Sequence, residues 1–65
     1  MSYVPKVSGQ NCYIYDAQTG RQVQAINRSQ GFKSAVCDGE VVTLTLASGR
    51  IEVINIRTGQ VIRVL

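Results

Sequence analysis

Short runs of apolar and β-branched residues alternate with turn residues along most of this 65-residue chain. No stretch has apolar residues at the three- and four-residue spacing of an amphipathic helix, and the gaps between runs are too short for helical crossovers. The runs predict six strands, which cover residues 12–15, 21–26, 33–37, 41–46, 51–56 and 60–65. The predicted fold class is therefore all-β, with a six-stranded antiparallel meander.

Residues 1–11 lack this regularity, because Pro5, Ser8, Gly9 and Asn11 interrupt it. They are predicted to form an irregular N-terminal arm, and residues 12–65 a single β-meander domain. Within that domain Asp38-Gly39 separates two predicted strands. An Asp-Gly pair at such a position favours a tight hairpin turn, because glycine accepts the positive φ that the turn requires.

Alternation along the strands predicts which residues face the core. In residues 41–46 the aliphatic side chains share one face and the threonines share the other, which is typical of a half-buried strand. The last two runs differ, because both of their faces are apolar. The second face is expected either to meet another chain or to close into a small barrel. The residues predicted for an oligomer interface are Ile54, Ile56, Ile62 and Val64.

An internal repeat links the two halves of the chain. Residues 14–23 recur as residues 53–62, with Thr19-Gly20 matching Thr58-Gly59 at an offset of 39 residues. Apolar positions correspond along the whole segment, from Ile14 with Val53 to Ile26 with Leu65. This offset is close to the period of about 40–45 residues found in WD40 blades.

From Gly31 to the end, the chain resembles one blade of a WD40-like β-propeller. Gly31-Phe32 stands where such blades often have Gly-His, and Ile54-Asn55 stands where Trp-Asp is usual. Residues 12–26 resemble the last two strands of a preceding blade, with Tyr15-Asp16 in the Trp-Asp place. The resemblance implies a propeller-blade-like meander of about one and a half blades, so several chains would associate to complete the structure.

Composition excludes several chemistries. The chain has no His, so it lacks the commonest general base and metal ligand. It also has no phosphate-binding glycine motif and no spaced metal-ligand clusters. We expect no enzyme activity, no metal and no cofactor. The sequence also lacks an apolar run long enough to span a membrane and a recognisable signal peptide, so we expect a cytoplasmic protein. Its two cysteines, Cys12 and Cys37, are accordingly expected to be thiols.

The four acidic residues are expected to have structural roles. Asp16 and Asp38 occupy turn positions, where a short carboxylate can bind the local backbone. Glu52 lies within a predicted strand and is expected to face solvent.

The net charge of +3 is predicted to gather at one end of the sheet. In a meander successive turns fall at alternating ends, which places Arg28, Lys33 and Arg50 together. These three residues are the candidate site for an anion or an acidic partner. An alternative is that they are solvated turn residues that keep the protein soluble.

The function expected from these features is that of a non-enzymatic interaction or assembly module acting as a homo-oligomer. The alternative is a small nucleic-acid-binding β-domain that uses Arg28, Lys33 and Arg50. The expected partners are thus further copies of the chain, or an acidic protein or nucleic acid, and no membrane.

Overall fold

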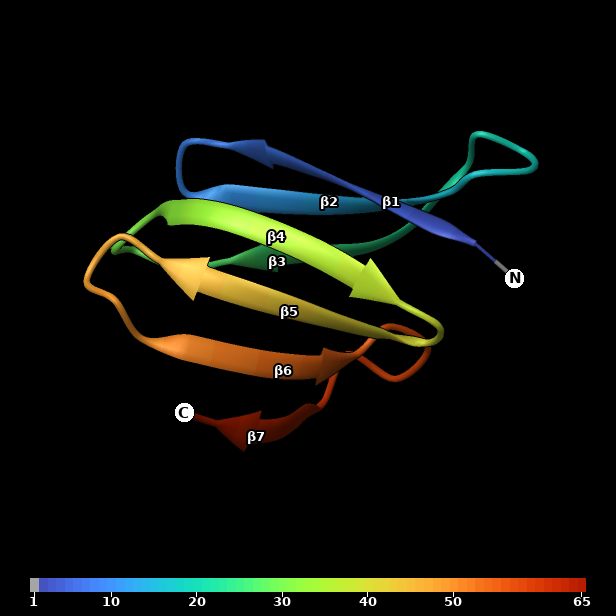
Figure 1. Ribbon diagram of the computed structural model, residues 1–65. Helices are drawn as coiled ribbons and strands as arrows, with labels where there is room; N and C mark the ends of the chain where they lie inside the picture. Colours follow the sequence, from blue (N-terminus) through green and yellow to red (C-terminus); the bar gives the residue numbers. More distant parts are fainter. Residues whose placement is uncertain (1) are drawn as a thin grey trace.

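The computed structural model describes residues 2–65, which form seven strands and no helix (Figure 1). One sheet consists of β1 (Tyr3–Ser8), β2 (Asn11–Asp16) and β3 (Gln22–Asn27). The other consists of β4 (Phe32–Asp38), β5 (Val41–Leu46), β6 (Ile51–Asn55) and β7 (Val61–Val64). Neighbouring strands within each sheet are antiparallel. The all-β antiparallel prediction is confirmed, and the six predicted strands begin and end within one residue of β2 to β7.

Two parts of the prediction are wrong. The described residues contain seven strands rather than six, and they form two open sheets instead of one meander or a closed barrel. The additional strand, β1, lies in the segment expected to be an irregular arm. Pro5 is tolerated there because β1 is paired only with β2, so a missing backbone donor on its other side breaks no ladder bond.

The two sheets pack face to face and enclose one small core (Figure 1). Sheet β1–β3 contributes Cys12, Ile14 and Ile26. Sheet β4–β7 contributes Val42, Leu44, Leu46, Ile54 and Ile56. The Cα atoms extend 32 × 22 × 15 Å along the principal axes, so there are only two layers and the outer face of each sheet has no covering element.

The turns that follow β2 and β6 have the same hydrogen bonds. Asp16 Oδ1 accepts bonds from the backbone N–H groups of residues 18 and 19, at 2.8 and 3.3 Å. Asn55 Oδ1 accepts the corresponding bonds from residues 57 and 58, at 2.9 and 3.2 Å. Both turns end in a glycine with positive φ, 76° at Gly20 and 77° at Gly59, where a side chain would be strained. The predicted turn role of Asp16 is confirmed, and the internal repeat is present in three dimensions.

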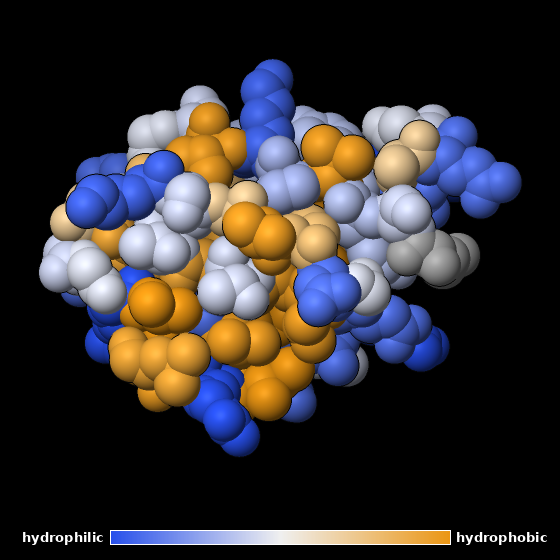
Figure 2. All heavy atoms as spheres, in the orientation of Figure 1, coloured by the Kyte–Doolittle hydropathy of each residue, from blue (hydrophilic) through white to orange (hydrophobic). Residues whose placement is uncertain are grey.

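Strand β7 lies at the open edge of its sheet, and all four of its residues are exposed. On the opposite sheet, the edge strand β3 lies against the end of β6, where Gln24 Nε2 donates a hydrogen bond of 3.1 Å to the Ile56 carbonyl. Apolar side chains consequently remain at the surface, and Figure 2 shows many of them over the half of the molecule where β6 and β7 lie. The most exposed are Val36, Ile62 and Leu65, at 62%, 55% and 67%.

Candidate functional site

Three connections meet at one end of the molecule, as the sequence predicts. The Arg28 N–H donates to the Gln10 carbonyl at 3.0 Å, which joins the loop after β3 to the turn after β1. The Ala47 N–H donates to the Gly31 carbonyl at 3.0 Å, which adds the turn after β5. Arg28 and Arg50 are thereby brought to the same end of the fold.

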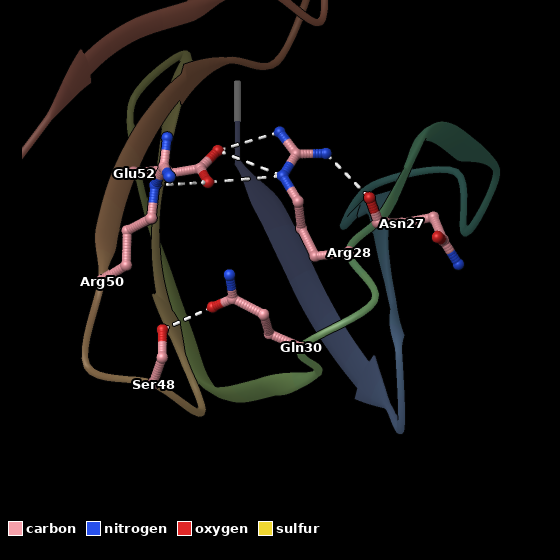
Figure 3. A network of polar contacts seen from close by, with 6 residues as sticks. All are labelled: Asn27, Arg28, Gln30, Ser48, Arg50 and Glu52. Carbon is pink, nitrogen blue, oxygen red and sulfur yellow. Dashed lines mark hydrogen bonds and ion pairs between the residues drawn. The ribbon is translucent and has the colours of Figure 1, made fainter.

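A carboxylate that was expected elsewhere lies between these two arginines (Figure 3). Arg28 Nη2 is 2.8 Å from Glu52 Oε1, and Arg28 Nε donates to both carboxylate oxygens at 3.2 and 3.3 Å. Arg50 Nε is 3.3 Å from Glu52 Oε2. Two guanidinium groups therefore share one carboxylate, and the cluster carries one net positive charge.

The solvent-facing position predicted for Glu52 is wrong, because its residue surface is only 3% exposed. Glu52 alternates with the buried Ile54 and Ile56, so it belongs to the core face of β6. This alternation can be read from the sequence. The partner cannot, because Arg28 comes from a loop on the other sheet, 24 residues away.

The Arg28 hydrogen bonds are the main reason that the pKa of Glu52 lies below its ordinary value. Burial acts in the opposite direction, and the positive charges of Arg28 and Arg50 add to the lowering. Glu52 is therefore ionised at neutral pH, and it holds the loop after β3 against the beginning of β6.

Further polar contacts fix the loops around this cluster. Arg28 Nη1 donates to the Asn27 carbonyl at 2.8 Å, and the Ser48 hydroxyl bonds to the Gln30 side chain (Figure 3). Lys33 is exposed at the beginning of β4 and lies outside the Arg28–Glu52–Arg50 cluster. Of the three predicted anion-site residues, the structure thus joins Arg28 and Arg50 through an acid, and Lys33 takes no part in this cluster.

The arrangement is better suited to holding the two sheets together than to capturing a free anion. Arg28 directs its guanidinium at Glu52 and its side chain is only 33% exposed. Arg50 is the more accessible partner, with 51% of its side chain exposed. A phosphate approaching this end would have to compete with a buried carboxylate for the same donors.

The four residues predicted for an oligomer interface separate into two pairs. Ile54 and Ile56 are each 1% exposed and lie in the core between the sheets, so they supply no surface to a partner. Ile62 and Val64 are exposed on β7. The correction follows from β1–β3, because that sheet covers the face of β6 that the sequence left open to another chain.

Both cysteines are free thiols, with Cys12 buried and Cys37 partly buried. Burial, together with the charge of Cys37, raises the pKa of Cys12 to about 11. Burial also raises the pKa of Cys37, which is only partly buried. The thiolate is the reactive form, so neither group is prepared to act as a nucleophile at neutral pH.

We expect the two thiols to react at different rates with a thiol-specific reagent at pH 8. In the folded protein Cys37 should be modified first, and Cys12 should react only when the core opens. Stopped-flow absorbance with and without guanidinium chloride measures this, and Cys37→Ser leaves Cys12 as the single reporter. Rapid modification of Cys12 in that folded variant would contradict the buried position.

Among residues 2–65 no group of three potential ligands lies close enough to hold a metal, and no pocket is present. The same residues include no helix that is both long and apolar enough to cross a membrane. The sequence matches no protein-family model and no curated protein.

Proposed function

We propose that this chain is a non-enzymatic β-sheet interaction module that acts by associating with further copies of itself. The main support is the exposed apolar surface that remains after the two sheets have packed. Val36, Ile62 and Leu65 are each more than half exposed, although all three lie in or next to strands. Val36 and Leu65 lie on the outer side of sheet β4–β7, and Ile62 lies on its open edge strand. Exposed apolar surface of this kind is typical of a protein–protein interface.

The free edge of β7 supports the same proposal. β7 pairs only with β6, so one side of its backbone has no strand partner among the described residues. An open apolar edge strand readily pairs or aggregates unless another surface covers it. An association that covers β7 would remove this hazard.

No observation favours the nucleic-acid alternative equally. Arg28 and Arg50 are engaged by Glu52, and Lys33 takes no part in these ion pairs. Phosphate binding needs cations that are free to neutralise the phosphates, and Glu52 already neutralises one of the two arginine charges at this end.

Light scattering over a range of protein concentrations, at low and at high salt, tests the proposal. We expect a mass above that of one 7.1 kDa chain, and we expect it to persist at high salt because apolar burial is not screened. A single-chain mass at all concentrations would refute the proposal. If that monomer bound nucleic acid with an affinity that falls steeply with salt, the alternative function would replace it.

A further inference from the structure

We infer that the copies associate head to tail, with the outer face of sheet β4–β7 in one copy packed on the outer face of sheet β1–β3 in the next. This inference deepens the proposed function, because it names the two surfaces that meet. It is derived from the internal repeat and from the way in which the two halves of the repeat pack inside one chain.

The repeat is structural as well as sequential. At the offset of 39 residues β2 corresponds to β6 and β3 to β7, and the strand registers correspond as well. Ile14 pairs with Gln24 and Tyr15 with Gln22, across a bulge. Val53 pairs with Arg63 and Ile54 with Val61, across a bulge at the same place. Together with the matching turns, this makes β2–β3 and β6–β7 two versions of one unit.

The two versions bury opposite faces. We define the first face of the unit by Cys12, Ile14 and Ile26 in one sheet and by Ile51, Val53 and Leu65 in the other. In sheet β1–β3 this face is in the core, with both Cys12 and Ile14 at 0% exposure. In sheet β4–β7 it is the outer face, where Leu65 is 67% exposed.

The opposite, second face shows the reverse. We define it by Tyr13, Tyr15 and Ala25 in one sheet and by Glu52, Ile54 and Val64 in the other. Glu52 and Ile54 lie in the core, and Val64, on the edge strand β7, is 47% exposed. Tyr13 and Tyr15 are partly exposed on the outer side of β2. The contact inside the chain is therefore between a first face, from β1–β3, and a second face, from β4–β7.

One first face and one second face are left without a partner. They lie on the two outer sides of the molecule, so a single chain cannot bring them together. A second copy can, by repeating between chains the contact that already exists within one. The occupant of the outer face of β4–β7 is thus the outer face of β1–β3 from another copy.

The side chains on the two outer faces are suited to this contact. Val36, Thr43 and Val53 form one row across sheet β4–β7. Across from them would lie Val4, Tyr13 and Tyr15, where tyrosines can bury their rings and keep their hydroxyls near water. Lys6 occupies a position on the second face of β1–β3, and its aliphatic stem can cover apolar surface while the ammonium group reaches solvent.

A specific polar contact is also expected at this interface. Inside the chain, Gln24 Nε2 donates to the Ile56 carbonyl. The equivalent of Gln24 is Arg63, and the equivalent of Ile56 is Ala17. Arg63 of one copy therefore lies opposite the Ala17 carbonyl of the next. Such an interface joins two different surfaces, so the assembly either closes into a ring or extends as a filament.

Two charge substitutions test the inference. Val36→Glu blocks the outer face of β4–β7, and Val4→Glu blocks that of β1–β3; Val36 is 62% and Val4 49% exposed, so both variants should fold. Each variant alone should have the mass of one chain under conditions where the wild type is assembled. Mixed in equal amounts they should form a complex of two chains and nothing larger, because only one intact first face and one intact second face can meet.

Native mass spectrometry measures these masses, and circular dichroism verifies that each variant is folded. Ser29→Glu, which adds the same charge at an exposed position in the loop after β3, is the control and should assemble like the wild type. Leu65→Glu provides a second substitution on the face of Val36. Suppose that the wild type is assembled. The head-to-tail arrangement alone would then be overturned if Val4→Glu assembled like the wild type, or if the mixture of the two variants formed no two-chain complex. A monomeric wild type would overturn the proposed function as well.

Discussion

Replacing Ile54 by alanine is expected to remove most of the stability of the folded chain. Ile54 is 1% exposed between the two sheets, and truncating a buried isoleucine to alanine costs about 2–5 kcal/mol, depending on how far the cavity collapses. Domains are stable by about 0.05–0.15 kcal/mol per residue, so the loss is comparable to the whole free energy of unfolding of a chain this short. Urea denaturation followed by circular dichroism measures the change.

Ile62→Ala is the matched control, because it removes the same atoms from a side chain that is 55% exposed. We expect this variant to lose less than about 1 kcal/mol, since an exposed position leaves no cavity. Both measurements belong at a protein concentration low enough to keep the chains apart. Equal losses in the two variants would mean that Ile54 is not in the core and that the packing of sheet β1–β3 on β6 is wrong.

Glu52→Gln is expected to lower the free energy of unfolding by about 1–3 kcal/mol at pH 7. Glutamine keeps the shape and one acceptor oxygen, but it leaves Arg28 and Arg50 without their shared negative charge. The cost stays below that of a fully buried pair because the Arg28 side chain is 33% exposed and water can solvate part of it. Chemical denaturation of the two proteins in parallel gives the difference.

The pH dependence of this difference identifies its cause. The folded-state pKa of Glu52 is lowered, so its contribution is fully present above the unfolded-state value and is lost as the pH falls through the folded-state value. The two proteins should therefore converge in stability in acid, where Glu52 is protonated. Glu40→Gln is the control, because its 3.6 Å ion pair with Arg57 is exposed and should contribute less than about 1 kcal/mol. A difference that persists unchanged in acid would exclude the ion-pair explanation.

The ion-pair cluster also explains how so small a core can hold two open sheets together. Sheet β1–β3 and sheet β4–β7 share no ladder of strand hydrogen bonds. They are joined by apolar packing, by a backbone bond of 3.3 Å from the Phe32 N–H to the Gly9 carbonyl, and by two side-chain contacts, the Gln24–Ile56 bond and the Arg28–Glu52 pair. Gln24 lies within β3 and Arg28 directly follows it, so these two side-chain contacts attach β3 to β6 at two points.

Local signals in the sequence predicted the strands well. Six of the seven strands, the hairpin at Asp38-Gly39 and the carboxylate-bound turn at Asp16 follow from residue type and from an alternation of period two. The missed strand, β1, contains Pro5, and a proline is compatible with a strand only at an edge. Whether a strand is at an edge depends on its neighbours in the fold, so the sequence pattern could not decide it.

The candidate site was likewise predictable only in part. Its end of the molecule was predictable, because the parity of turns in a meander places Arg28 and Arg50 together. The buried acid between them was missed. Its position on the core face follows from its alternation with Ile54 and Ile56, but an acid on such a face is stable only with a partner, and that partner belongs to a distant loop.

The positions of β2 to β7, the alternation of faces along each strand and the repeat can be predicted from the sequence alone, because they depend on residues a few positions apart or on a comparison of the chain with itself. Which apolar face of β6 is internal depends on the tertiary structure. Both faces are apolar enough to be buried, and the choice was made by sheet β1–β3, which packs on Ile54 and Ile56 and leaves Ile51 and Val53 on the outer side. That choice depends on long-range packing, in which each sheet provides the apolar environment of the other. The residue types along one strand cannot predict it.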